Sequence, residues 1–325
     1  MRSKCLLIIL SYNLKLNGVK LQEMKRQVIK GSMLILKGLV KYFPVLFEFL
    51  LTVFKFIVKN LVSYRKCVIK DNLNNSFCDV YAEDDRNQIV DKYYSVMFRY
   101  IKETIMMLSF DQKVLKSKIN YHEQDRWEGY FNNQMSVIVT ASHFGNWEVN
   151  MVAFPALTRM KVVAFYKPMS GSDVEKIMFE ARSKFGLHLY PIHLTARVMQ
   201  ELKMERVLYV FLGDQSPLNM NGVYWNTFLN QHTPWMTGAE KLAKKYHYPV
   251  VYLSQKPIIA SDVWYELNFY LISDDSADTI EGEITEKYSR ILEAEIKQNP
   301  EYWLWSHNRW KRANIKNLAH NKSFG

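Results

Sequence analysis

The chain has 325 residues, of which 48% are hydrophobic and 14% aromatic, and it carries 43 Lys and Arg against 32 Asp and Glu, a formal net charge of +11. This composition is ample for a core in one or two domains, and the charge indicates an acidic partner: nucleic acid, anionic lipid or an acidic carrier protein. The three cysteines, at positions 5, 67 and 78, form no CxxC pair. They argue against a metal centre or a disulfide framework and favour reduced thiols in a cytosol-facing protein.

The N-terminal region is basic and irregular. We expect residues 1–35 to be an extension, with translation starting at Met24 or Met33 as a hypothesis. The rest of the chain is predicted to divide into a membrane-anchoring helix at 36–64 and a larger domain at 65–325. That domain is expected to have a helical lead-in at 65–130 and an α/β body at 131–325.

Residues 42–63 form an apolar segment that is long enough to span a bilayer but carries three charges. At 100° per residue the polar side chains fall on one narrow stripe, formed by Lys41, Glu48, Thr52, Lys55 and Lys59. The remaining faces are Phe, Leu, Val and Ile. A core helix of a soluble domain is the alternative. We favour a membrane anchor that either lies in the interface or is tilted with its stripe against protein.

Behind the anchor, residues 84–109 have the pattern of an amphipathic helix, in which Glu103 is more simply a solvated acid than a buried partner. From residue 135 strands alternate with helices. The predicted strands are 136–141, 161–166, 188–192, 207–212, 250–254 and 264–272, and the predicted helices are 147–157, 172–186, 195–204, 233–246 (capped at Thr233 before Pro234) and 279–298. This βαβα order predicts an α/β fold with a mostly parallel sheet flanked by helices.

A histidine follows the first buried strand, in the stretch Val-Ile-Val-Thr-Ala-Ser-His143-Phe-Gly-Asn-Trp-Glu148. Gly145 allows the connecting turn to bend back, and Asn146 is a good N-cap for the next helix. This geometry can bring Glu148 to one imidazole nitrogen of His143 and leave the other nitrogen free to take a proton from an alcohol. A buried structural histidine is the alternative, because the spacing alone also arises by chance.

Further polar residues follow the next strands. Lys167 comes at the end of 161–166, where a cation binds phosphate or stabilises an oxyanion, and Arg182 in the following helix is a second candidate. Asp214 and Gln215 follow the apolar strand 207–212. Because parallel strands end at one edge of a sheet, we expect His143, Lys167 and Asp214 to converge there.

The C-terminal segment mixes aromatic and basic residues, as Pro300-Glu-Tyr-Trp-Leu-Trp-Ser-His307-Asn-Arg309-Trp-Lys311. It can bind a headgroup or pack the last helix onto the body.

Together these segments resemble the late, secondary (lauroyl/myristoyl-type) acyltransferases of lipid A biosynthesis, within the His-x4-Asp/Glu lysophospholipid acyltransferase superfamily. The resemblance runs from about residue 64 to residue 311. The matching segments are Tyr-Arg-Lys…Asn-Leu…Phe at 64–77, Glu103, His143 to Glu148, Tyr-Lys-Pro at 166–168, Arg182-x3-Gly186, Asp214-Gln215 and Trp305-x-His-x-Arg-x-Lys311. The chain departs from the pattern in having Lys167 where relatives commonly have Arg, and it lacks a second acid near Asp214.

The resemblance implies transfer of an acyl chain from an acyl carrier protein, or from coenzyme A, to a hydroxyl of a lipid A precursor. His143 is then the general base and Glu148 fixes its tautomer, with no metal and no cofactor beyond the acyl donor. The expected substrate-binding residues are Asn146, Lys167, Arg182, Asp214, Gln215, His307 and Arg309. The expected location is the cytoplasmic face of the bacterial inner membrane, against its anionic surface.

Three other functions are weighed against this one. An acyltransferase acting on a lysophospholipid or an amino-acid lipid has the same chemistry. A membrane-peripheral protein that binds nucleic acid or anionic lipid is supported only by the net charge, and nucleic-acid motifs are absent from the sequence. A serine hydrolase would need a G-x-S-x-G elbow, which the sequence lacks.

Overall fold

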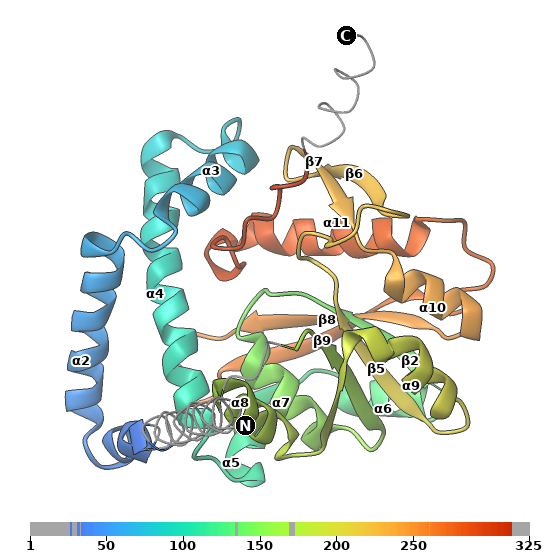
Figure 1. Ribbon diagram of the computed structural model, residues 1–325, viewed down its shortest axis with the longest axis horizontal. Helices are drawn as coiled ribbons and strands as arrows, with labels where there is room; N and C mark the ends of the chain where they lie inside the picture. The colour runs from blue at the N-terminus through green and yellow to red at the C-terminus, as the bar shows by residue number, and fades with distance from the viewer. Residues whose placement is uncertain are drawn as a thin grey trace, which may run out of the picture.

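The sheet at the centre of the molecule has seven strands. The computed structural model describes residues 27, 31–32, 34–133, 136–168, 173–259 and 261–313, and Figure 1 shows their arrangement. The strand order is β1-β9-β8-β2-β5-β3-β4, and every neighbouring pair is parallel except β8 with β9. The strands are β1 (Ile119–Tyr121), β2 (Ser136–Ala141), β3 (Lys161–Tyr166), β4 (Leu187–Pro191), β5 (Val207–Leu212), β8 (Val250–Pro257) and β9 (Tyr265–Ser273). The predicted α/β fold with a mostly parallel sheet is confirmed.

Helices cover both faces of this sheet, because successive side chains of a strand point to opposite faces. In β2, Val137 and Val139 belong to one buried cluster and Ile138 to the other. The first cluster is covered by α5 (Gln112–Ser117), α6 (Gln124–Asn132) and α7 (Trp147–Leu157), with α8 (Asp173–Ser183) beside α7. The second is covered by α9 (Thr195–Glu201), after the 3₁₀ turn Ile192–Leu194, by α10 (Gly238–Tyr246) and by α11 (Glu283–Gln298). A core on both faces explains why the strands read as nearly continuous apolar runs.

The helices ahead of α5 include α2 (Pro44–Phe56), continued by a π-helical turn at Ile57–Leu61, α3 (Lys66–Phe77) and the long α4 (Glu83–Met107), and residues 34–42 are helical as well. The helix α2 stands beside α4 at the edge of the molecule (Figure 1). Its polar stripe faces α4: Glu48 pairs with Lys102, and Nζ of Lys59 lies 2.7 Å from a carboxylate oxygen of Asp91. Two residues of the stripe, Glu48 and Lys59, therefore contact α4, whereas Lys41 and Thr52 are exposed, and the membrane anchor stays a prediction.

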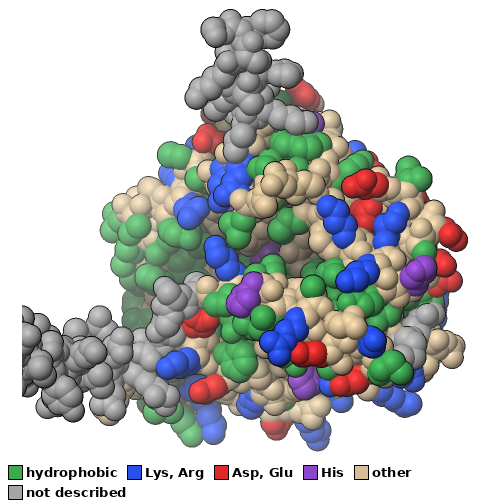
Figure 2. Space-filling model, turned by 45° about the vertical axis from the view of Figure 1, so that its right-hand side comes forward, with side chains coloured by type: hydrophobic (Ala, Val, Ile, Leu, Met, Phe, Trp, Pro, Cys, Tyr) green, Lys and Arg blue, Asp and Glu red, His purple; other side chains and the backbone are tan. Residues whose placement is uncertain are grey.

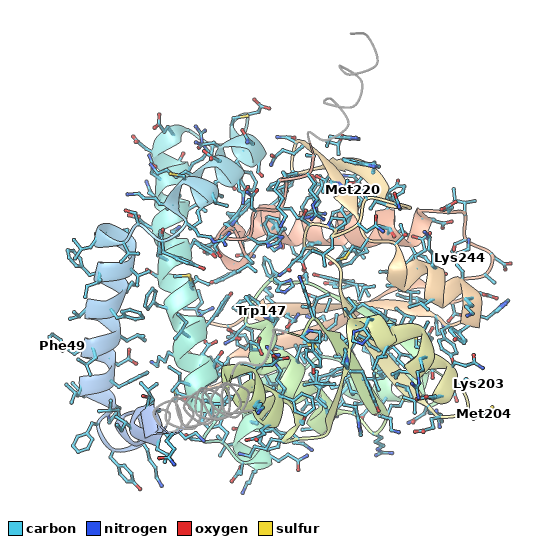
Figure 3. All side chains as sticks on the ribbon, viewed as in Figure 1. Phe49, Trp147, Lys203, Met204, Met220 and Lys244 are labelled. Carbon is cyan, nitrogen blue, oxygen red and sulfur yellow. The ribbon has the colours of Figure 1, made fainter. Side chains whose placement is uncertain are left out.

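The opposite face of α2 is apolar and open. Figure 3 shows Phe49 directed away from the body of the protein, and its side chain is 63% exposed. Phe43, Val45, Leu50, Phe56, Leu61 and Val62 are also exposed, and Phe54, although exposed, contacts Phe98 of α4 with ring centroids 5.5 Å apart. Within the described part of the chain, none of the helices is both long and apolar enough to cross a membrane.

One predicted helix begins too early. Residues 224–235 form a hairpin of β6 (Tyr224–Phe228) and β7 (Gln231–Trp235), and α10 begins only at Gly238. Thr233 and Pro234 therefore lie in a strand, and Pro234 pairs with Trp225. The buried Trp235, whose indole N–H donates to the side chain of Asn226 at 2.8 Å, fixes the strand against its neighbour. In a two-stranded hairpin a proline costs little because one side of each strand has no ladder partner.

Within the stretch expected to be the helical lead-in, the short strand β1 was not predicted, and α5 and α6 had not been singled out as separate helices. Most of residues 1–35, and residue 172 where one helix was expected to begin, lie outside the described residues.

Candidate active site

The register of two neighbouring strands places His143 beside Asp214. In the parallel pair β2–β5, Ala141 is opposite Leu212. Each of the two polar residues stands two positions beyond the end of its strand, so the same register carries them to the same point of the sheet edge. The predicted convergence of His143 and Asp214 is confirmed by two direct contacts between them.

Asp214 binds both the ring and the backbone of His143. Its Oδ1 lies 2.6 Å from Nδ1 of the imidazole, and its Oδ2 accepts the backbone N–H of His143 at 2.8 Å. A carboxylate only accepts hydrogen bonds, so Nδ1 carries the proton and Nε2 is left with its lone pair. The side-chain amide of Gln215 lies 3.0 Å from that Nε2. The imidazole therefore has the tautomer of a general base, with an amide resting on its basic nitrogen.

Asp214 is held in a closed environment. Its carboxylate is 2% exposed and also accepts the indole N–H of Trp303 at 2.8 Å. Trp303 itself is fixed by a backbone bridge to Phe144, the residue after His143. Burial by itself raises the pKa of Asp214, but the charge and hydrogen bonds of His143 and the bond from Trp303 outweigh it and lower that pKa. The group is thus an anion suited to stabilise a protonated imidazole.

The prediction that Glu148 binds His143 is wrong. Glu148 lies in the first turn of α7 and binds Arg182 of α8 through two hydrogen bonds, Nε to Oε2 at 2.8 Å and Nη2 to Oε1 at 2.5 Å. The physical reason is that α7 begins beyond the turn, which directs Glu148 toward α8, while Asp214 already occupies Nδ1 of His143. A bidentate pair of this kind fixes both side chains. Burial lowers the pKa of Arg182, but the hydrogen bonds and the charge of Glu148 outweigh burial, and the pKa is raised overall.

The turn between His143 and Glu148 has the predicted construction. Gly145 has φ of +72°, and a Cβ there would lie 2.6 Å from the carbonyl oxygen of Gln255, so only glycine fits. Asn146 caps α7 by accepting the N–H of Val149 at 3.3 Å. Its amide also donates to Glu103 of α4 at 3.0 Å. Glu103 is therefore a buried partner rather than the solvated acid expected, and burial raises its pKa.

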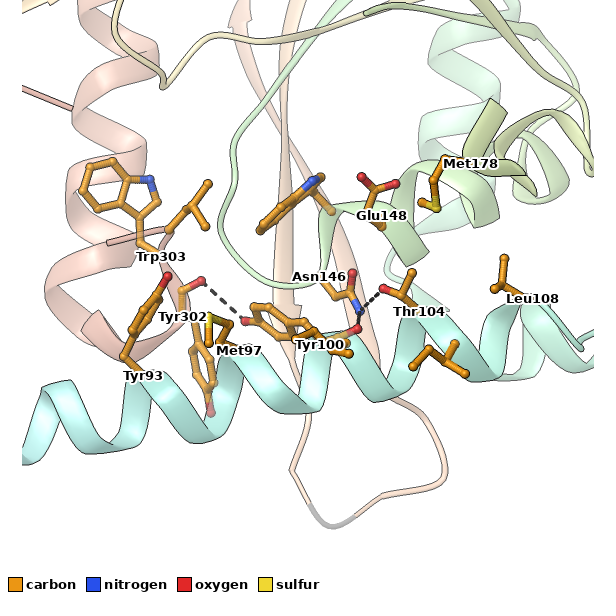
Figure 4. Close-up of a pocket in the computed structure, with 14 residues that line it drawn as sticks. Tyr93, Met97, Tyr100, Thr104, Leu108, Asn146, Glu148, Met178, Tyr302 and Trp303 are labelled. Carbon is orange, nitrogen blue, oxygen red and sulfur yellow. Dashed lines mark hydrogen bonds between the residues drawn. The ribbon is translucent and has the colours of Figure 1, made fainter. Parts of the chain in front are cut away.

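An apolar cavity of about 310 Å³ lies between α4, the start of α7 and the segment 302–304. Figure 4 shows side chains of α4 along one side and Glu148 and Met178 across from them. The lining is formed by Tyr93, Met97, Tyr100, Ile101, Thr104, Ile105, Leu108, Asn146, Trp147, Glu148, Met178, Tyr302, Trp303 and Leu304. A slot with this lining suits a hydrocarbon chain.

A second cavity, of about 300 Å³, opens on the other side of Trp147 and Glu148 and contains His143. It is more polar, since Lys167 and Arg182 also line it. Both cavities share Trp147, Glu148 and Met178, so they meet at the Glu148–Arg182 pair. Figure 2 shows a hollow in one face of the protein with Lys and Arg side chains around it.

The two C-terminal candidates have other positions. Nε2 of His307 accepts the backbone N–H of Ser216 at 3.1 Å, and burial lowers the pKa of this histidine to about 4, so it is neutral. Arg309 is fully buried, donates to the carbonyl of Pro234 at 2.7 Å and stacks on Trp235. The substrate contact expected for Arg309 conflicts with this burial, and His307 instead supports the turn that carries Asp214.

Sequence reasoning missed two features of the site. Trp303 lies inside the aromatic C-terminal segment that had been singled out, but nothing in the sequence connected it with Asp214. The apolar cavity depends on residues of α4 spaced as one helix face, among them Tyr93, Met97 and Tyr100, which read equally well as core.

A base oriented by a buried acid, next to a slot for a hydrocarbon chain, is the arrangement of an enzyme that acts on lipids. The model of the bacterial lipid A biosynthesis acyltransferase family matches residues 31–312. The chain belongs to this family. It is therefore an acyltransferase by family, and the match covers both the helical lead-in and the α/β body. No curated protein matches the chain.

Proposed function

We propose that this acyltransferase moves a fatty acyl chain from the thioester of an acyl carrier protein to a hydroxyl of a lipid A precursor. The observation that carries the proposal is the hydrogen bond between Nδ1 of His143 and Asp214, with His143 lining a polar cavity that adjoins an apolar one. Family membership supports the reaction type.

In the proposed mechanism His143 is the general base. The acceptor hydroxyl replaces the amide of Gln215 at Nε2 and gives its proton to that nitrogen while its oxygen bonds to the thioester carbon. The C–S bond then breaks, and the protonated imidazole returns the proton to the leaving thiolate. Asp214 stabilises the imidazolium between these steps, as oriented acid–base pairs do. No covalent acyl-enzyme forms.

The two cavities bind different parts of the substrates. The apolar cavity suits the acyl chain, because all but a small part of its lining is aliphatic or aromatic. The second cavity suits the polar part of a substrate, since Lys167 and Arg182 supply positive charge beside His143. Glu148 keeps the guanidinium of Arg182 in place at the junction. Positive charge so close to the reacting carbon also stabilises the oxyanion of the tetrahedral intermediate.

The proposed location is the cytoplasmic face of the bacterial inner membrane. Support comes from the exposed apolar face of α2, which includes Phe49 and Phe56. A helix whose polar stripe contacts protein at Glu48 and Lys59 and whose other faces are apolar is suited to lie in the interface. The net charge of +11 suits an anionic membrane and an acidic carrier protein.

The test is a radiolabelled acyl-transfer assay on membranes with an acyl carrier protein thioester as donor. Wild type is compared with His143→Ala, and the lipid products are separated by mass. A labelled lipid A precursor, reduced about 100-fold or more in the variant, supports the proposal. A labelled lysophospholipid or amino-acid lipid moves the acceptor and keeps the mechanism. Product formation that does not depend on His143 contradicts the mechanism.

A further inference from the structure

A third cavity, of about 660 Å³, lies between α2 and α4, away from the residues that carry the proposed chemistry. Four of its lining residues are cations: Lys55 and Lys59 on the α2 side, and Lys92 and Arg99 on α4. Asp91 and Glu301 are the two acids in the lining. We refer to this cavity, lined by Lys55, Lys59, Asp91, Lys92, Ser95, Val96, Arg99, Ile259, Glu301 and Tyr302, as the basic groove.

The charges of the basic groove are not balanced by the protein. Lys59 pairs with Asp91 at 2.7 Å, and Nε of Arg99 lies 3.3 Å from Glu103. Lys55 and Lys92 form no ion pair with any residue that the structure describes. The two helices thus place positive charge without a counter-ion among the described residues on both sides of the groove, which favours the binding of an anion there.

Arg99 supplies a second, independent sign of a missing ligand. Its Nη2 is buried and has no hydrogen-bond partner among the described residues. The guanidinium is stacked between the rings of Tyr100 and Tyr302, at 5.5 and 5.4 Å, and so is held in one orientation. Buried donors normally find acceptors, and a fixed guanidinium is well suited to the oxygens of a phosphate.

We propose that the basic groove binds the phosphate of a membrane lipid headgroup. The lipid is indicated by the position of the groove: one wall is the helix α2, whose outer face is apolar and exposed around Phe49. Lys55 and Lys59 lie about one helical turn apart on the polar side of the same helix, where they can meet the headgroup of a lipid bound to that face. On the other side, Tyr302 lines both the basic groove and the apolar cavity, so the bound headgroup lies next to the acyl slot.

The test uses dihexanoyl phosphatidic acid as the probe and the full-length protein in neutral detergent, with affinity measured by calorimetric titration. Wild type is expected to bind saturably, and Lys55→Gln/Lys92→Gln to bind about tenfold or more weakly, because two charge-assisted contacts are lost. The conservative Lys55→Arg/Lys92→Arg variant should retain binding. The matched control is Lys203→Gln/Lys245→Gln, on the opposite side of the molecule from α2, where Figure 3 labels Lys203; this variant should bind as wild type does.

Several outcomes would overturn the proposal. One is equal affinity in wild type and in the Lys55→Gln/Lys92→Gln variant when the two have the same unfolding temperature. Another is that dihexanoylglycerol binds as tightly, which would assign the affinity to the chains. If inorganic phosphate binds as tightly as dihexanoyl phosphatidic acid, the groove does not recognise a lipid. If the Lys55→Gln/Lys92→Gln variant loses affinity only for acyl carrier protein, the groove binds a protein partner instead. None of these measurements requires turnover, so they are independent of the proposed acyl transfer.

Discussion

Asp214 uses its two carboxylate oxygens on one residue, binding the imidazole Nδ1 of His143 with Oδ1 and the backbone N–H of the same histidine with Oδ2. The ring and the main chain of His143 are thereby fixed together, and Nε2 of the imidazole points in a single direction. An acid that bound only the ring would leave the histidine free to swing with its loop.

Asp214→Asn should lower kcat by about 100-fold or more. An asparagine amide can donate to Nδ1, which moves the proton of His143 to Nε2 and removes the base. The turnover of the variant is measured beside His143→Ala, which sets the floor. Turnover near that of wild type, in a variant that is folded, would show that Asp214 does not set the tautomer.

Glu148→Ala is expected to reduce activity strongly and to leave the fold intact, because Arg182 loses its bidentate partner. In a double-mutant cycle with Arg182→Ala, the effects on kcat should be non-additive by about 1–3 kcal/mol. The control is the exposed pair Arg197–Glu201 on α9, whose removal by alanine substitution should leave kcat unchanged. Additive effects of Glu148 and Arg182 would contradict a functional pair.

Gly145→Ala should destabilise the protein by about 2 kcal/mol or more and lower activity with it. The residue has φ of +72°, which costs an L-residue about 1–2 kcal/mol, and the added Cβ meets the carbonyl of Gln255. Gly129, in α6, has open space around it, so Gly129→Ala should instead raise the free energy of unfolding slightly. Urea denaturation of both variants measures the difference, and equal stability of the two would contradict the clash.

The buried Glu295 should make stability depend on pH. It accepts hydrogen bonds from Tyr252 and Ser254, and burial raises its pKa from 4.5 to about 7. Between these two values the folded protein keeps a proton that the unfolded chain gives up, so this group's stabilisation is complete below about pH 4.5 and is lost as the pH rises toward 7.

The variant that isolates this effect is Glu295→Gln. Relative to wild type, its free energy of unfolding should increase by about 1–3 kcal/mol between about pH 5 and about pH 8. His307, whose pKa is lowered to about 4, has the opposite slope but is present in both proteins, so it cancels in the comparison. If the difference in free energy of unfolding between the two proteins does not change with pH, Glu295 does not titrate in this range.

Phe49→Ser/Phe56→Ser should weaken sedimentation with lipid vesicles by about tenfold or more, since burial of each phenyl ring in an apolar phase contributes about 1.5–3 kcal/mol. Both side chains are largely exposed, so the unfolding temperature should stay the same. Phe47→Ser is the contrasting variant: Phe47 is 5% exposed, and its loss should lower stability. Unchanged vesicle binding by the double variant would remove α2 as the anchor.

The sequence predicted the fold and the position of His143 well because both depend on local patterns. Apolar strands followed by small or polar residues define β2, β3 and β5, and polar residues at their carboxyl ends must share an edge of a parallel sheet. The hairpin at β6 and β7 was missed because Thr233 and Pro234 have the same local signature as a helix start. Only the packing of Trp235 separates the two readings.

The partner of His143 could not be predicted from spacing. Glu148 is close in sequence, whereas Asp214 is 71 positions away from His143 and becomes its neighbour only through the β2–β5 register. Sequence proximity favoured the wrong acid, and the tertiary register selected the right one. The buried role of Glu103 was ranked below a solvated acid for the same reason, since its partners Asn146 and Tyr265 are distant in the chain.

In the proposed reaction, the amide of Gln215 at Nε2 of His143 would protect the thioester donor from hydrolysis in the absence of an acceptor. A water molecule that attacks the thioester must first displace the Gln215 amide from Nε2 of His143. Water makes few other contacts that would hold it at this position. An acceptor lipid bound in the neighbouring cavities is kept at that position by the rest of its structure. We therefore expect hydrolysis of the bound thioester to be slow when no acceptor is present.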